Sequence, residues 1–375
     1  MLDYILLNLT ESASACLSAM SNMIIGEEKE VFLELCDRIL KQEYQGEENN
    51  KYLFSQVKDH PIGHVTTALL NLWLQRKPND NDKLPADIEI FLTRLCDTKV
   101  EWFRYGRVLL ASHLITLFRV DSDWTEKHLL PLFDWNNDDI EAKAVWEGFL
   151  LGENDLDEPN WSDYLHEPLL IKLKKQFFNT AHDYYYEKLS IKSQNCFSKF
   201  FTYIALEPIN DYTELNFQNA AKKLPPEAWQ YILEALIEAL EKSEQREEYW
   251  KNSVLPFWRN IWRKHKDIKS PEITELLANL SVMARDEFQN AVNAFEYWLQ
   301  KIDYEPHCYN AVSQLLETGL AKKYPEVSLK FLDAIIGVKS WGTPELKECL
   351  DAISQENEKL KDDLRYQRLD SLCAH

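Results

Sequence analysis

The clearest structural signal in the chain is QREEYWKNSVLPFWRNIWRKHKDIK, residues 245–269. Its large apolar residues recur at the spacing of one helical face: Trp250, Val254, Trp258 and Trp262. Pro256 stands inside this pattern, and because proline has no backbone N–H, we expect the helix to kink or restart there. The aromatic residues are expected to pack in a core, since the stretch contains no catalytic constellation.

The same stretch holds the densest basic run of the chain. Four of its residues are predicted to contact a protein partner: Arg259, Arg263, Lys264 and Lys266. The alternative is that these charges form a solvated helix face and the loop that follows it.

Proline-marked helix starts follow this stretch at regular intervals. Proline fits the first position of a helix, where its missing N–H costs nothing, and it stands there at Pro271, Pro306, Pro325 and Pro344. Alternate starts are 306 − 271 = 35 and 344 − 306 = 38 residues apart, a period typical of stacked helix pairs. Together with only 9 glycines in 375 residues, this predicts an all-α fold, an irregular α-solenoid of stacked antiparallel helix pairs.

An acidic polar stretch, residues 152–160, is the best predicted boundary. It would divide the chain into an N-terminal helical half, 1–152, and a C-terminal helical-repeat half, 160–375, unless the two form one continuous array. Residues 100–120 are predicted as one long helix, and a charged helix is expected from Pro344 to about Leu372.

Charge and cysteine usage limit the class of partner. The formal net charge of −20 disfavours nucleic acid and allows a basic protein partner. The 7 cysteines are scattered without a CxxC pair, which indicates neither a zinc ribbon nor a disulfide framework and favours reduced residues in a cytoplasmic protein. The N-terminal segment lacks the features of a signal peptide, and no apolar run is long enough to span a membrane.

Several residue groups have both a structural and a functional interpretation. His60 and His64 are four apart, as metal ligands on a helix would be, but no third ligand is near and a capping role is favoured. Arg104 and Arg107 are expected to snorkel or to pair with a carboxylate of the next helix rather than form an anion site. Further on, a group of acidic residues is interpreted as helix caps rather than a calcium loop: Asp134, Asp138, Asp139 and Glu141. An aromatic triplet is interpreted as core and rim packing: Tyr184, Tyr185 and Tyr186.

No segment carries the motif of a serine hydrolase, a zinc protease, a P-loop or a redox dithiol. We therefore expect a protein that is not an enzyme, with no catalytic, cofactor-binding or metal-binding residue. Acidic pairs such as Glu247 and Glu248 are interpreted as solvated helix faces.

Seven segments together resemble a known family: LFDWNN (132–137), EAKAVWEGFL (141–150), LPPEAW (224–229), QREEYWKNSVLPFWRNIWRK (245–264), FLDAII (331–336), ELKECLDAI (345–353) and RYQRL (365–369). The resemblance is to the C-terminal helical region of bacterial antiphage-defence proteins that carry an N-terminal SIR2-like, NAD-hydrolysing module. It covers at least residues 100–370.

The resemblance implies a non-catalytic scaffold or sensor that binds a protein partner, a phage protein or a SIR2-like effector module, and regulates or assembles the effector. No Gly-rich nucleotide loop is present, so no NAD-site residue is carried over, and we expect either a fragment of a longer protein or a stand-alone relative. The alternatives are a structural or oligomerisation module and a cryptic hydrolase.

Overall fold

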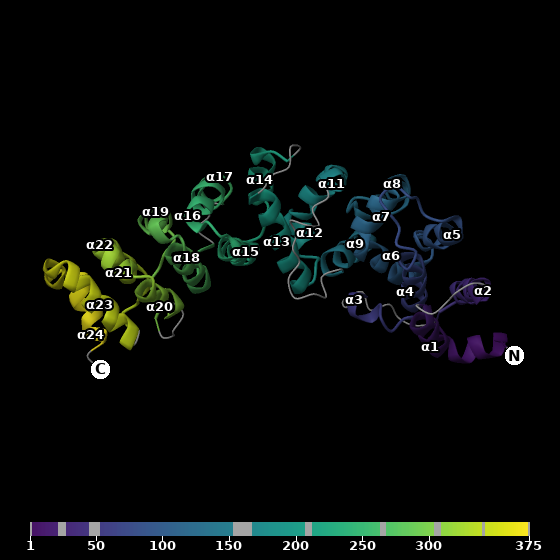
Figure 1. The fold of residues 1–375 in the computed structure, drawn as a ribbon, viewed down its shortest axis with the longest axis horizontal. Coiled ribbons are helices and arrows are strands. Elements are labelled where there is room, and N and C mark those ends of the chain that lie inside the picture. Colours follow the sequence, from purple (N-terminus) through teal and green to yellow (C-terminus); the bar gives the residue numbers. More distant parts are fainter. Residues whose placement is uncertain are drawn as a thin grey trace. The chain divides into compact units, whose positions relative to one another are not determined.

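A computed structural model describes residues 2–21, 28–44, 53–152, 167–206, 212–262, 268–303, 309–339 and 342–373. All regular elements in these ranges are helical, and the extended pairing they contain is one isolated bridge between Ile302 and Ile336. Figure 1 shows the helices in chain order. The prediction of an all-α fold is confirmed.

The chain divides into two compact units, Met1–Phe197 and Ser198–His375, and the division falls inside helix α13 (Ile191–Leu206). Most of the predicted boundary, residues 153–160, lies outside the described residues, so the predicted halves stay a prediction.

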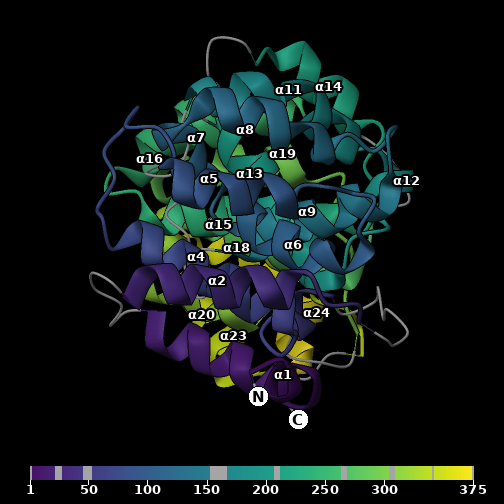
Figure 2. The same ribbon diagram turned by 90° about the vertical axis from the view of Figure 1, so that its right-hand side faces the viewer.

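Unit 1 is built around α6. Helices α4 and α9 both pack against α6, while α1, α2 and α4 pack against one another, as the two ribbon views agree (Figures 1 and 2). The elements before α13 are α1 (Leu2–Met20), α2 (Glu28–Leu40), α3 (Leu53–Gln56), α4 (Pro61–Leu74), α5 (Ala86–Leu95), α6 (Arg104–Ser112), α7 (Leu114–Val120), α8 (Ser122–His128), α9 (Asp139–Leu151), α11 (Glu167–Thr180) and α12 (Asp183–Tyr186).

Two features hold α6 and α9 together. Gly148 lets the backbones approach, because a Cβ added there would lie 2.3 Å from the carbonyl oxygen of Val108. Glu141 accepts hydrogen bonds from Nε of Arg104 and Nε of Arg107, each at 2.7 Å. Arg107 is fully buried and Glu141 is 2% exposed. Of the two predicted outcomes the arginines therefore adopt pairing with a carboxylate, but the carboxylate lies on α9 and not on the next helix along the chain.

Unit 2 continues with short helices that pack on neighbours close in sequence. Helix α18 contacts α15, α19 and α20, while α23 contacts α20, α22 and α24. The elements are α14 (Glu214–Ala221), α15 (Ala228–Lys242), α16 (Arg246–Tyr249), the π-helical turn η4 (Trp250–Val254), α17 (Leu255–Asn260), α18 (Pro271–Met283), α19 (Phe288–Phe295), α20 (Tyr309–Glu317), α21 (Leu320–Lys323), α22 (Pro325–Ile335), α23 (Pro344–Glu356) and α24 (Leu364–Leu372).

Two helices of unit 2 begin directly after a residue whose side chain caps them. Ser270 Oγ accepts from Ile273 N at 3.2 Å and Thr343 Oγ1 accepts from Leu346 N at 3.2 Å, so each side chain satisfies an amide that the first turn leaves unpaired. Helices α18, α22 and α23 begin at the predicted prolines. The start predicted at Pro306 lies outside the described residues.

Two helices predicted as continuous are interrupted at polar residues. Residues 100–120 break at His113, where Ser112 Oγ donates to Leu109 O at 2.7 Å and so offers the backbone a local alternative. The helix from Pro344 ends at Glu356, since Asn357 is extended at φ −144° and ψ 90°. Asp363 then caps α24 by accepting from Arg365 N at 2.8 Å.

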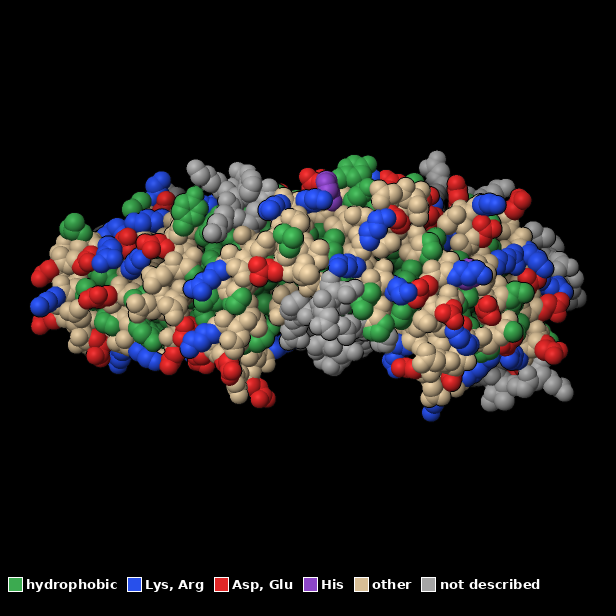
Figure 3. Space-filling view, turned by 90° about the horizontal axis from the view of Figure 1, so that it is seen from above, with side chains coloured by type: hydrophobic (Ala, Val, Ile, Leu, Met, Phe, Trp, Pro, Cys, Tyr) green, Lys and Arg blue, Asp and Glu red, His purple; other side chains and the backbone are tan. Residues whose placement is uncertain are grey.

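The surface carries both charge signs side by side. Figure 3 shows acidic and basic side chains intermixed on the face it draws. Many are paired, as Arg119 is with Asp80 at 2.7 Å and Lys330 with Glu296 at 2.7 Å. The net charge of −20 therefore comes from the acidic residues that exceed these pairs.

Candidate functional site

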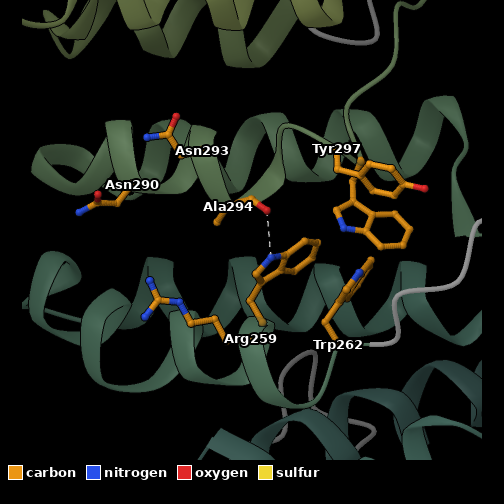
Figure 4. Close-up of a pocket in the computed structure, with 8 residues that line it drawn as sticks. Arg259, Trp262, Asn290, Asn293, Ala294 and Tyr297 are labelled. Atoms are coloured by element: carbon orange, nitrogen blue, oxygen red, sulfur yellow. Dashed lines mark hydrogen bonds between the residues drawn. The ribbon is translucent and has the colours of Figure 1, made fainter.

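A hollow of about 750 Å³ lies in unit 2, between α17 and the end of α19. Figure 4 shows Arg259 and Trp262 on the α17 side and Asn290, Asn293 and Tyr297 on the α19 side, with the Asn293 side chain directed away from α17. The described lining residues are Trp258, Arg259, Trp262, Asn290, Asn293, Ala294, Tyr297 and Trp298.

Three tryptophans form the floor of this hollow. The rings of Trp258 and Trp262 stack with centroids 4.3 Å apart and an angle of 26° between their planes, and Trp298 meets Trp262 edge-on at 5.7 Å. Trp258 Nε1 donates to Ala294 O at 3.2 Å, the bond drawn in Figure 4. The three side chains are only 4–6% exposed, which confirms that these aromatics pack in a core.

The π-helical turn η4 comes directly before α17 and orients it. Pro256 has no N–H, and the amide of Leu255 reaches back five residues to Trp250 O. The interruption predicted at Pro256 is therefore present as a π-helical turn that ends at Val254, two residues before the proline. Such turns are frequent at functional sites.

Around the floor, polar side chains form a rim. The guanidinium of Arg259 is exposed and forms no hydrogen bond or ion pair with the described residues, and the same holds for the side-chain amide of Asn293. Asn290 Nδ2 donates to Glu287 Oε2 at 2.6 Å. Lys269 Nζ lies 3.9 Å from the ring centroid of Tyr297, a cation–π contact.

The acidic residues flanking the rim are already neutralised. Lys251 Nζ lies 2.9 Å from Glu287 Oε1, and this hydrogen bond holds the pKa of the Glu287 carboxyl below its ordinary value. Lys330 pairs with Glu296 at 2.7 Å. Arg259 and Lys269 are thus rim cations that no described carboxylate balances.

Of the four predicted contact residues, Arg259 lines the hollow, while Arg263, Lys264 and Lys266 lie outside the described residues. Asn290, Asn293 and Tyr297 are not predicted from the sequence. A second aromatic cluster at 295–298, FEYW, was the available signal, but only folding brings it opposite α17.

The other groups singled out in the sequence have structural roles. His60 Nδ1 accepts from Ile62 N at 3.1 Å and caps α4, and the described residues hold no cluster of three or more potential metal ligands. Asp138 Oδ1 accepts from Ile140 N at 2.9 Å and caps α9. Tyr186 is buried and Tyr184 is 59% exposed, so the triplet divides between core and surface as predicted.

No family model, curated protein or solved structure matches the chain. In the part of the chain that the structure describes, each helix is too short or too polar to cross a membrane.

Proposed function

We propose that the chain is a non-catalytic helical scaffold or sensor that binds a protein partner through the hollow between α17 and α19. One observation carries this proposal: three tryptophans and a tyrosine line the same hollow as an exposed arginine that no described residue pairs. Tryptophan, tyrosine and arginine are the residues enriched at the energetic centres of protein interfaces.

We also propose that unit 2 is a short irregular α-solenoid. Contacts between successive helices support this, since one row runs α15, α18, α20, α23 and a second row runs α19, α22, α24. Such arrays bind partners along extended surfaces and need no active-site motif.

The identity of the partner follows from the resemblance to antiphage-defence proteins. A SIR2-like effector module or a phage protein is the proposed partner, in the cytoplasm of a bacterium, and the chain would regulate or assemble the effector. The segment 245–264, which carries part of that resemblance, includes Trp258, Arg259 and Trp262 of the hollow.

The test is affinity purification of the full chain from the cells that naturally make it. Arg259→Glu is expected to lose a stoichiometric partner that the wild type and Lys322→Glu retain. Lys322 is a matched control, because it is exposed in the same unit and away from the hollow. The partner is then purified, rebound, and its NAD hydrolysis measured with and without the chain. If Arg259→Glu retains the partner as well as the wild type does, and the melting temperatures are unchanged, the proposal is rejected.

A further inference from the structure

The shape and chemistry of the hollow select one kind of ligand. Its rim offers a cation at Arg259 and an amide at Asn293, which can donate and accept hydrogen bonds at once. Its floor is apolar. A ligand that fits must therefore combine negative charge, paired donor and acceptor groups, and an apolar group.

Among the described lining residues, Tyr297, which is 58% exposed, offers the ring surface that a planar ligand such as a nucleobase would need, and the tryptophans do not. A base needs an open ring face, but Trp258 and Trp262 already stack on each other at 4.3 Å. One face of Tyr297 is covered by Lys269 at 3.9 Å. An aliphatic or single-ring side chain needs only the ring edges and the floor, and a peptide main chain carries the donor and acceptor pair that Asn293 matches.

We propose that the hollow binds an acidic linear peptide segment in which carboxylates pair with Arg259, the main chain bonds Asn293, and one apolar side chain packs on Trp258 and Trp298. Charge complementarity carries the choice of an acidic segment: Glu287 and Glu296 beside the hollow are paired with Lys251 and Lys330, and Arg259 is not paired by any described residue. This inference rests on the proposed function, because it specifies which part of a protein partner is bound.

The test uses short fluorescein-labelled peptides and the full chain, with binding followed by anisotropy. One peptide has a central leucine flanked by glutamates, the second replaces the glutamates with glutamine, and the third replaces the leucine with serine. The first is expected to bind about tenfold more tightly than either of the others. Arg259→Ala should weaken the first peptide about tenfold and leave the glutamine peptide unchanged, a coupling that identifies the pair; Lys322→Ala should change neither.

Three outcomes would overturn the inference. The serine peptide could bind as tightly as the leucine peptide, which indicates charge attraction alone, or Arg259→Ala could leave the affinity for the leucine peptide unchanged. The third outcome is that adenosine monophosphate binds and the leucine peptide does not. Arg259 and Lys322 are exposed, so both variants are expected to fold, and their thermal melting checks this. If the peptides fail while Arg259→Glu still releases the purified partner, the peptide inference is wrong and the scaffold proposal stands. If Arg259→Ala weakens binding of the leucine peptide but Arg259→Glu still retains the purified partner, the scaffold proposal is wrong instead.

Discussion

Glu141 shares its carboxylate between two arginines in the core of unit 1. Its Oε1 also accepts from Nη2 of Arg107 at 2.8 Å, and the other Nη of Arg107 donates to the carbonyls of Leu95 and Asp97 at 3.2 and 3.0 Å. These bonds satisfy a guanidinium that has no access to water. Such a cluster is stable only while its carboxylate is present, because desolvated charges need their counter-charge.

Glu141→Gln should destabilise the protein by about 3–5 kcal/mol, since it leaves two buried arginines without a counter-charge. The matched control is Asp80→Asn, which breaks an arginine–carboxylate pair that is about half exposed and should cost at most about 1 kcal/mol. Urea unfolding followed by circular dichroism measures both. Equal losses for the two variants would contradict the role of burial.

His60 makes stability depend on pH. Its ring stacks on Tyr105 with centroids 3.9 Å apart, and burial, aided by repulsion from His64, lowers its pKa to about 4. The unfolded value is about 6.5, so between these values the unfolded chain binds more protons and stability falls as the pH falls. Protonation also removes the Nδ1 acceptor that caps α4.

His60→Asn keeps a capping oxygen but cannot titrate in this range. The loss of unfolding free energy from pH 7 to pH 5 should therefore be smaller in His60→Asn than in the wild type. Urea unfolding at the two pH values gives both differences. Identical losses would show that His60 does not contribute.

Close packing of α6 on α9 depends on a single missing side chain. Gly148→Ala would bring a methyl group against Val108 backbone atoms, which cannot move like a flexible side chain. We expect a destabilisation of about 1–3 kcal/mol. Ile140→Ala, at an exposed position 45% accessible in the same helix, should change stability by no more than about 0.5 kcal/mol. Thermal unfolding of the two variants measures both changes, and equal losses of stability would contradict the role of Gly148.

At this scale the sequence predicts helix starts better than helix lengths. Ser270 and Thr343 are recognisable because a capping side chain and a following proline act within one turn. The breaks at His113 and Asn357 were missed, since Ser112 and Asn357 permit a helix as well as an interruption and tertiary packing decides. Which helices pack against each other is harder to predict, because apolar periodicity shows which face of a helix is buried but not which helix covers it.

On the scale of the molecule, acidic residues outnumber basic ones by 62 to 42. Local pairs are attractive, but the excess charge repels itself in the compact state. Raising sodium chloride from about 20 mM to about 200 mM shortens the screening length several-fold and should raise the unfolding midpoint by a few degrees. Differential scanning fluorimetry measures it, with tetramethylammonium chloride as a control for specific cation binding. A falling midpoint would mean that the ion pairs outweigh the repulsion.

The candidate site was half predictable at this scale. Trp258, Trp262 and Arg259 belong to one periodic stretch, so their helical face and the charge beside it follow from spacing alone. Asn293, in α19, and Tyr297, in the turn after α19, come more than thirty residues later, and it is tertiary packing that brings them opposite α17.

The turn η4 gives the hollow an unusual sensitivity to chain length. A π-helical turn holds one residue more than an α-helical turn, and each residue rotates an α-helix by about 100°. Deleting one residue from this turn, such as the exposed Asn252, would let the helix run on in α geometry and change which side chains α17 presents to α19. Related chains that differ by one residue here would then carry the same tryptophans with a different rim, so insertions and deletions could alter the ligand as readily as substitutions.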